Sequence, residues 1–430
     1  MSAGVKIVLA AMLCLAATAC RRTAVTTPEG YQTPAEATTL APAPTTPATT
    51  TTIPTTTTTM PTRLKAPELT EPPLVRVLLD DMPKSVTIKC TGSYVMRPHG
   101  PRVYPRRTPW EFTTRAFVSP EGIKIGTETY NCDMVDVEPS YPLSRDTIKV
   151  EGRAFPRAIR LIRVGNGLAV VNMVDMETYL RGSVPAEMPA DWHPEALKAQ
   201  AVASRSYALY HWQLRTEANY DVVSSVDDQV YRGAVFSPAA DKAIAATRGQ
   251  VLTHDDELFP AYFHSTCGGN TETPAAGLGR AQPDWMKGVP CNGCEDSPHF
   301  RWAADFTGAQ LLLSLKDRLA SDAPVSAVSV LAMPLGRNAR VQQGEQATDI
   351  PILDFRRALG AAVIRSGRFN CVSDANGFHF IGSGLGHGVG MCQYGARGMA
   401  NAGKSCETIL QHYYPGTETV KLYQENQEGR

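Results

Sequence analysis

A threonine- and proline-rich tract restricts folding to the part of the chain that follows it. Between residues 23 and 62, 25 of 40 residues are threonine or proline. Such a segment has little apolar surface to bury, and proline with β-branched threonine favours extended backbone. We therefore expect residues 21–73 to be a disordered tether. In a chain of 430 residues, the folded part should begin near residue 74.

The segment before this tether has the features of an export signal. Lys6 precedes an apolar run over residues 7–19, which ends in small residues. Cys20 follows directly, so residues 1–20 resemble a signal with a lipobox, in which Cys20 would be lipidated. Ordinary signal cleavage with an incidental thiol is the alternative. Either interpretation predicts export to the cell envelope or periplasm, where disulfides can form, and the first adds a lipid anchor in the membrane.

Charge and hydropathy exclude several classes of protein. The chain has 42 basic and 42 acidic side chains, which excludes a nucleic-acid binder that relies on bulk positive charge. No apolar run reaches the ~18 residues of a membrane-spanning helix. A hydrophobic fraction of 43% is sufficient for a substantial core.

The pattern of apolar residues predicts an α+β fold. Short β-branched runs separated by glycine, proline and asparagine indicate a mostly β domain over residues 74–172. Residues 173–425 alternate helical and strand-like patterns and form the second, mixed region. Cys90 and Cys132 lie on separate candidate strands of the β domain. In an exported protein they could form a disulfide, although two buried thiols are the alternative.

Glu187 is the first candidate for chemistry. It lies between Pro185 and Pro189 in a stretch, residues 181–189, that we interpret as a rigid apolar turn. Desolvation raises a carboxyl pKa, and a carboxylic acid that is protonated near neutrality can act as a general acid. A partner of the next helix dipole or a surface glutamate are the alternatives. Asp191 is the predicted cap of that helix, and Arg205 of the helix lies off the face lined with small residues.

A glycine-dense block over residues 382–396 is the second candidate. Its glycines allow backbone amides to approach a ligand, and His387, Gln393 and Tyr394 provide polar groups and an aromatic face that suit a sugar. The block matches neither a Walker loop nor a dinucleotide fingerprint, so no organic cofactor is expected. A tight structural turn is the alternative.

Cysteines form the third candidate site. Cys291 and Cys294 are spaced as in a zinc knuckle, and together with Cys267 and His299 they give a plausible tetrahedral set for one structural zinc ion. His264 is an alternative ligand. A redox pair in the knuckle or a disulfide from Cys267 are the rival interpretations. At most one disulfide is expected among the three remaining cysteines, Cys371, Cys392 and Cys406.

Several blocks in a fixed order resemble the SpoIID/LytB family. The blocks cover residues 184–189, 195–207, 229–233, 264–271, 387–396 and 409–417, and the resemblance extends over roughly residues 75–425. Its enzymatic branch consists of lytic transglycosylases, which cleave peptidoglycan between N-acetylmuramic acid and N-acetylglucosamine and leave a 1,6-anhydro end. They prefer strands stripped of stem peptides. The other branch consists of amidase enhancers, which stimulate a cell-wall amidase instead of cutting.

The resemblance assigns roles to particular residues. The catalytic glutamate of the enzymatic branch falls on Glu187, which would act alone as general acid and then as base. Some members bind zinc near the segment that matches residues 264–299, while Cys392 stands where many members have serine. Arg205, His387, Gln393 and Tyr394 are the expected contacts to the sugars or to the catalytic carboxyl.

Overall fold

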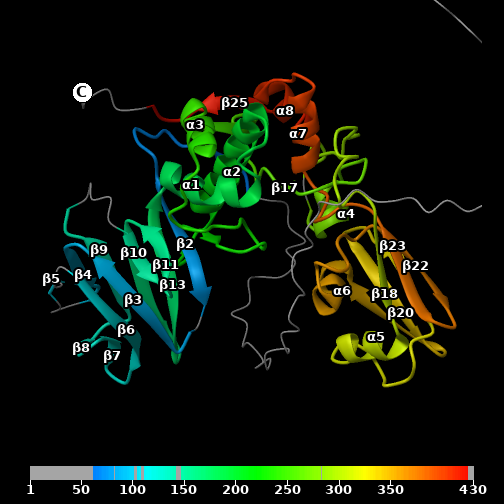
Figure 1. The fold of residues 1–430 in the computed structure, drawn as a ribbon, viewed down its shortest axis with the longest axis horizontal. Coiled ribbons are helices and arrows are strands. Elements are labelled where there is room, and N and C mark those ends of the chain that lie inside the picture. The colour runs from blue at the N-terminus through cyan, green and yellow to red at the C-terminus, as the bar shows by residue number, and fades with distance from the viewer. Residues whose placement is uncertain are drawn as a thin grey trace, which may run out of the picture. The chain divides into compact units, whose positions relative to one another are not determined.

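The computed structural model describes residues 62–81, 83–100, 104–107, 111–141, 147–281 and 283–424. The predicted export signal, Cys20 and most of the predicted tether lie outside these ranges. Within them, largely antiparallel sheets are combined with separate helices, so the predicted α+β class is confirmed (Figure 1). No helix in this part of the chain is long and apolar enough to cross a lipid bilayer.

Two sheets share one hydrophobic core in the first part of the described chain. One sheet runs, in spatial order, β14 (Val222–Val223), β2 (Leu74–Asp81), β13 (Gly167–Asp175), β12 (Ala158–Val164), β9 (Met134–Pro139), β4 (Tyr94–Pro98) and β5 (Arg106–Arg107). The other runs β11 (Arg153–Pro156), β10 (Thr147–Val150), β3 (Ser85–Thr91), β6 (Glu111–Ser119), β7 (Gly122–Ile125) and β8 (Glu128–Tyr130).

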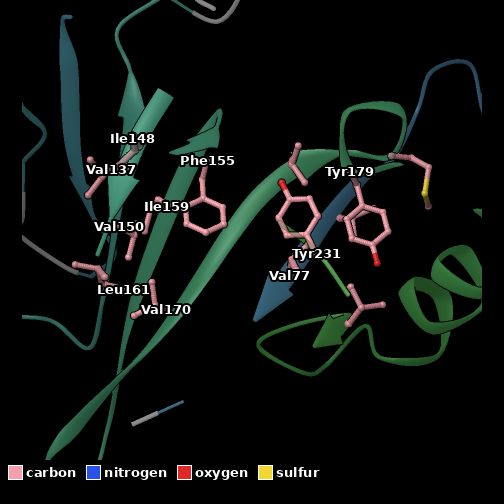
Figure 2. Packing of buried hydrophobic residues seen from close by; sticks show 14 of the residues in the cluster. Val77, Val137, Ile148, Val150, Phe155, Ile159, Leu161, Val170, Tyr179 and Tyr231 are labelled. Atoms are coloured by element: carbon pink, nitrogen blue, oxygen red, sulfur yellow. The ribbon is translucent and has the colours of Figure 1, made fainter. Parts of the chain in front are cut away.

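The burial pattern of each strand follows from its place in these sheets. Strand β13 lies between β2 and β12, and nearly all of its residues are buried. Strand β3 alternates partly exposed and buried residues, as expected when one face of a sheet packs on a core. Figure 2 shows the packed side chains, among them Val137, Ile148, Leu161 and Val170.

The predicted disulfide between Cys90 and Cys132 is wrong, because both side chains are free thiols. Cys90 lies in the core, where burial raises the pKa of its thiol to about 12. The Cys132 thiol donates a hydrogen bond to the carbonyl of Met134 at 3.2 Å. Both sulfurs therefore have separate environments within the β region.

Helix α2 (Pro194–Leu214) is the centre of the helical part. It contacts α1 (Met176–Glu187), α3 (Pro238–Ala246), α7 (Gln393–Asn401), α8 (Cys406–Tyr413) and strand β15 (Gln250–His254), and the helices of this group lie together in Figure 1. Its many alanines allow this close packing on several sides. The residue that caps α2 is His193, not the predicted Asp191, because Pro194 takes the first helical position and the cap is the residue directly before it.

Two small sheets join the end of the chain to its middle. A four-stranded sheet runs β1 (Leu64–Lys65), β16 (Glu257–Leu258), β15 (Gln250–His254) and β25 (Glu418–Lys421). In the other, β17 (Phe263–His264) pairs in parallel with β24 (Met391–Cys392), which sets His264 opposite Cys392. This pairing brings together two segments that are more than a hundred residues apart in the sequence.

A separate hydrophobic cluster is formed by residues between Trp302 and Phe380. One of its sheets runs β18 (Trp302–Phe306), β23 (Gly377–Gly382) and β22 (Phe369–Asp374). The other runs β19 (Ala327–Ala332), β20 (Arg337–Gln343) and β21 (Gln346–Pro351). Its helices are α5 (Gly308–Leu315) and α6 (Ile352–Leu359), and the short α4 (Pro274–Leu278) precedes them. Helix α6 ends at Leu359, because Gly360 has a φ of 92° that lies outside the helical region.

Candidate functional site

Glu187 is the last residue of helix α1. The turn that we predicted over residues 181–189 is therefore wrong for most of its length, since this stretch continues the helix. Asp175 caps the start of α1 by accepting a hydrogen bond from the Thr178 amide at 3.0 Å. Pro185 lacks the N–H that would complete the last turn, and the helix ends two residues later.

A loop over residues 228–233 lies against the second half of α1. The amide of Val230 donates a hydrogen bond to Glu187 Oε1 at 2.7 Å, and the amide of Arg232 donates to the carbonyl of Gly182 at 3.1 Å. A Cβ atom on Gly182 would lie 2.4 Å from the ring of Tyr231, so only glycine allows the loop this close to the helix. The approach of the loop is what brings a backbone donor to Glu187.

Side-chain hydrogen bonds hold the first two residues of this loop. Asp228 accepts from the Tyr207 hydroxyl at 2.6 Å and from Arg215 Nη1 at 3.0 Å. The Tyr179 hydroxyl donates to Gln229 Oε1 at 3.0 Å. Because these partners come from α1 and α2 and the loop that follows, the position of the Val230 amide is fixed by the packed helices.

Tyr231 fixes the other end of the loop. Its hydroxyl donates to Asn172 Oδ1 at 2.7 Å, and its ring stacks on Tyr179 with centroids 5.2 Å apart. Figure 2 shows these rings, with Phe155 of β11 nearby on the sheet side. The loop is thus tied to the β core as well as to the helices.

The Glu187 carboxyl group is partly buried and has polar contacts on both oxygens. Oε2 lies 3.4 Å from Gln393 Nε2, which in turn lies 3.3 Å from Gln200 Oε1. Burial raises the pKa of Glu187 above its usual value, while the Val230 and Gln393 hydrogen bonds and the charge of Arg232 act in the opposite direction. The net shift is upward, so the carboxyl group stays protonated to a higher pH than that of an exposed glutamate.

Arg205 does not face a ligand, contrary to our expectation. Its side chain has 0% exposure, and its guanidinium donates to both oxygens of Glu177 at 2.9 Å each. It also donates to the carbonyl of Gln250 at 3.0 Å, and the Tyr423 hydroxyl donates to Glu177 at 2.6 Å. This buried pair connects α1, α2, β15 and the end of the described chain.

Four buried cysteines form one cluster: Cys267, Cys291, Cys294 and Cys392. Their sulfur atoms all lie within 4.8 Å of one another, and Cys267 and Cys294 are 3.6 Å apart. Four sulfurs at ~2.3 Å from a tetrahedral zinc would be separated by about 3.8 Å, so the arrangement fits such an ion. These four residues could therefore hold a metal.

Hydrogen bonds and close packing surround the sulfur atoms. The amides of Cys267 and Gly395 each donate to the Cys392 sulfur at 3.3 Å, and the Tyr413 hydroxyl lies 3.2 Å from the Cys291 sulfur. A Cβ atom on Gly395 would lie 2.4 Å from the Cys291 sulfur, so glycine is needed there. Donors of this kind stabilise thiolates, which are the form that binds metals.

His299 and His264 are not members of this cluster, so the predicted ligand set is corrected at one position. The His299 ring lies 3.1 Å from Arg365 Nη1. His264 hydrogen-bonds the carbonyl of Val389 through Nδ1 at 3.0 Å. The pairing of β17 with β24 places Cys392 where we expected a histidine. Cys371 and Cys406 are free thiols elsewhere, so no disulfide forms among the three remaining cysteines.

His387 and Tyr394, two predicted sugar contacts, have different surroundings. The His387 ring packs near the rings of Tyr262 and His264, with centroids 6.1 and 5.5 Å away, and burial lowers its pKa to about 3. Its Nδ1 accepts a hydrogen bond from the Val389 amide at 3.1 Å, so this neutral ring is engaged within the protein. Tyr394 is partly exposed and directly follows Gln393 on α7.

Three groups at the site were not identified from the sequence. The Val230 amide is a backbone donor, and the type of residue at a position does not indicate whether its backbone amide contacts the site. Gln200 lies on the helix that contains Arg205, and only its contact with Gln393 reveals its role. Cys392 was visible as an unassigned cysteine next to Gln393, and its place in the glycine-dense block was the available signal.

Comparison with known proteins identifies the family of this chain. The sequence profile of the SpoIID family, stage II sporulation protein, matches residues 164–254. This range includes α1, α2 and the 228–233 loop. The stage II sporulation protein D of Bacillus subtilis (strain 168) is 31% identical over 285 residues, which are 62% of this chain and 80% of that protein.

Two further relatives extend the comparison. An uncharacterized protein of Brachyspira hyodysenteriae is 32% identical over 289 residues, covering 66% of this chain and 77% of that protein. The amidase enhancer of Bacillus subtilis is 28% identical over 292 residues, covering 55% of this chain and 40% of that protein. The chain belongs to the SpoIID/LytB family, and the predicted resemblance is confirmed.

Proposed function

We propose that this protein is an exported lytic transglycosylase, which cleaves peptidoglycan glycan strands between N-acetylmuramic acid and N-acetylglucosamine. The observation that carries the proposal is the carboxyl group of Glu187. It is partly buried, its pKa is raised, and it is held by a backbone amide and a side-chain amide at the end of a packed helix. A protonated and oriented carboxyl group is what protonation of a glycosidic oxygen requires.

One carboxyl group is sufficient for this reaction. Glu187 donates its proton to the glycosidic oxygen as the bond from that oxygen to C1 breaks. The C6 hydroxyl of the same muramoyl sugar then attacks C1 and gives its proton to the Glu187 carboxylate. The product is a 1,6-anhydro ring, no water is consumed, and the acid is regenerated. Because the nucleophile is part of the substrate, it is already near the reacting carbon.

Three carboxylates of α1 and the 228–233 loop have structural partners, which supports a single-acid mechanism. Glu177 is paired with Arg205, Asp175 caps α1, and Asp228 anchors the loop. Hydrolytic glycosidases use a second carboxyl group to activate water or to attack the sugar. Each of these three acids already has a structural partner, so none of them is free for that second role.

The experiment that tests this function is product analysis without any partner protein. Purified protein should release anhydro-muramoyl fragments from glycan strands that lack stem peptides, as detected by mass spectrometry. The similarity to an amidase enhancer supports a second candidate, a wall-binding protein that stimulates an N-acetylmuramoyl-L-alanine amidase. If that candidate is correct, the protein alone should release no product, and an added amidase should cleave its substrate faster in the presence of the protein.

The raised pKa of Glu187 predicts the pH dependence of cleavage. Activity needs the protonated acid, so kcat should be retained at low pH and fall as the pH rises through a pKa above the usual ~4.3 of glutamate. Gln393 lowers this pKa by bonding the carboxylate, so Gln393→Leu should move the alkaline limb to higher pH. Gln346→Leu, at an exposed glutamine, should not move it. An alkaline limb that Gln393→Leu leaves in place would contradict the assigned contact.

We also propose that Cys267, Cys291, Cys294 and Cys392 bind one structural zinc ion. Zinc with four thiolate ligands has no open position for water or substrate, so it would supply cross-linking and no catalytic step. Cys392 is the N-cap of α7, and Gln393 follows it directly. The centre would thereby fix the start of the helix that carries the Gln393 amide to Glu187.

Removal of two ligands should remove the metal and destabilise the protein. We expect purified protein to contain about one zinc, and the pair Cys291→Ser and Cys294→Ser to lose it and to melt at a lower temperature. Cys371→Ser, outside the cluster, is the control and should retain zinc. Metal analysis with thermal melting provides the measurement. Metal-free protein with a disulfide at Cys267 would refute zinc, and chelation that abolishes activity without lowering the melting temperature would refute a structural role.

Export and membrane attachment complete the proposal. The signal-like segment and Cys20 lie outside the described residues, so the argument for them is the sequence pattern alone. A lipid on Cys20, followed by the threonine- and proline-rich tether, would keep the folded part near a membrane while it acts on the wall. Metabolic labelling with a fatty acid should mark the wild-type chain and not Cys20→Ser.

A further inference from the structure

Two aromatic rings and a guanidinium form a partly exposed patch near the starts of helices α2 and α7. We call Trp192, Tyr394 and Arg397 the aromatic–arginine patch. The rings of Trp192 and Tyr394 have centroids 4.9 Å apart and planes inclined by 72°. The Arg397 guanidinium lies 5.4 Å from the Trp192 ring and 5.6 Å from the Tyr394 ring. Each of the three residues is partly exposed.

Both chain segments that carry the patch follow closely in sequence after residues that contact or adjoin Glu187. Tyr394 directly follows Gln393, whose amide contacts the Glu187 carboxyl group. Trp192 lies in the short connection from α1 to α2, four residues after Met188, the residue that caps α1. A ligand held on the patch would therefore lie close to the acid. The site described above does not use Trp192 or Arg397.

The only acidic side chain that pairs with Arg397 among the described residues is Asp296, at 3.3 Å, and the Asp296 side chain is 60% exposed. Ion pairs that are open to water are weak and exchange partners readily. Arginine binds carboxylates through two parallel hydrogen bonds, which favours it over lysine for this purpose. Arg397 can therefore exchange Asp296 for a carboxylate on a ligand while its contacts with the two rings hold it in place.

We propose that the aromatic–arginine patch is a binding subsite for a sugar ring that carries a carboxylate. The rings of Trp192 and Tyr394 supply apolar surface for the C–H face of the sugar, and Arg397 pairs with the carboxylate. This inference rests on the proposed function, in which the acidic sugar is a muramoyl residue. Its lactyl carboxyl group is charged only where no stem peptide is attached to it, so the subsite selects strands without peptides.

A purely structural role is the alternative, because Trp192 and Tyr394 also pack against the buried cluster below them. Such a role predicts that changes in the patch alter stability and affect all glycans equally. A carboxylate subsite predicts a difference between acidic and neutral glycans. Arg397→Gln distinguishes the two roles, because the Arg397 side chain is partly exposed and the substitution leaves both aromatic rings in place.

Binding is measured with the full chain carrying Glu187→Gln, so that no cleavage occurs during the titration. The probes are glycan strands without stem peptides and the same strands with their lactyl carboxyl groups converted to methyl amides. We expect Arg397→Gln to weaken binding to the acidic strands by roughly tenfold and to the amidated strands by less than about twofold, as a charge-assisted hydrogen bond would give. Trp192→Leu should weaken binding to both, with thermal melting to verify folding.

Tyr141→Leu and Arg357→Gln, which change an exposed aromatic residue and an exposed arginine elsewhere in the described chain, are the matched controls and should leave both affinities within about twofold. Equal weakening of both strands by Arg397→Gln, or none, would overturn the proposal. Cleavage by wild-type protein is assayed separately. Arg397-dependent discrimination without any anhydro product would support the subsite and reject the enzyme, and cleavage without discrimination would do the reverse.

Discussion

Glu187→Gln should abolish cleavage while leaving the fold and glycan binding intact. The glutamine keeps the size of the side chain and can still accept the Val230 hydrogen bond, but it can neither deliver nor take up the proton. General acid–base catalysis contributes typically ~10²–10⁴-fold. Because Asp175, Glu177 and Asp228 have structural partners, we expect a loss of kcat at the upper end of this range or beyond it, as measured by release of anhydro products.

Glu217→Gln is the matched control, since it changes an exposed glutamate in the turn after α2 in the same way. It should retain wild-type cleavage. The melting temperatures of both variants should lie close to that of the wild type, because the end of α1 is held by the loop and by backbone contacts. If Glu187→Gln keeps more than about a tenth of the wild-type rate, some other residue is the acid.

The sequence predicted elements well where local chemistry decides them. The helix after residue 191 was predicted from small residues on one face, and α2 follows with a cap two residues later than expected. The strands of the β region were visible from β-branched runs. The end of α1 was missed because two prolines suggest a turn, whereas Pro185 lies in the last turn of a helix whose other residues are largely buried.

The sequence identified many residues of the site by their type, but it did not predict which groups those residues contact. Cys392 was left unassigned, and its membership of the cluster depends on the pairing of β17 with β24, a contact between distant segments that no local pattern encodes. For Arg205, the sequence predicted the direction of the side chain but not the group that it contacts. The guanidinium lies off the small-residue face of α2, as predicted, but the polar group that it meets there is the buried carboxylate of Glu177.

Arg205→Ala should cause the largest loss of stability of any single change considered for this protein. Glu177 is only 4% exposed, and without the guanidinium its carboxylate would keep only the Tyr423 hydroxyl and the Gly249 amide as donors. Breaking a buried ion pair from one side costs about 3–5 kcal/mol, because the other charge remains buried and uncompensated. Urea unfolding should show this loss as a lower free energy of unfolding.

Two further variants identify the cause. Arg357→Ala removes an exposed arginine that pairs with Asp354 on α6, and it should change the free energy of unfolding by less than about 0.5 kcal/mol. Removing both buried charges, with Arg205→Met and Glu177→Gln together, should restore a large part of the stability that Arg205→Ala loses. If the double variant is as unstable as Arg205→Ala, the loss arises from packing and not from an unpaired charge.

The kinetics of Arg205→Ala test whether Arg205 contacts substrate. Because Arg205 has no access to a ligand, the KM of folded Arg205→Ala should equal that of the wild type. A raised KM would indicate that Arg205 is a substrate contact.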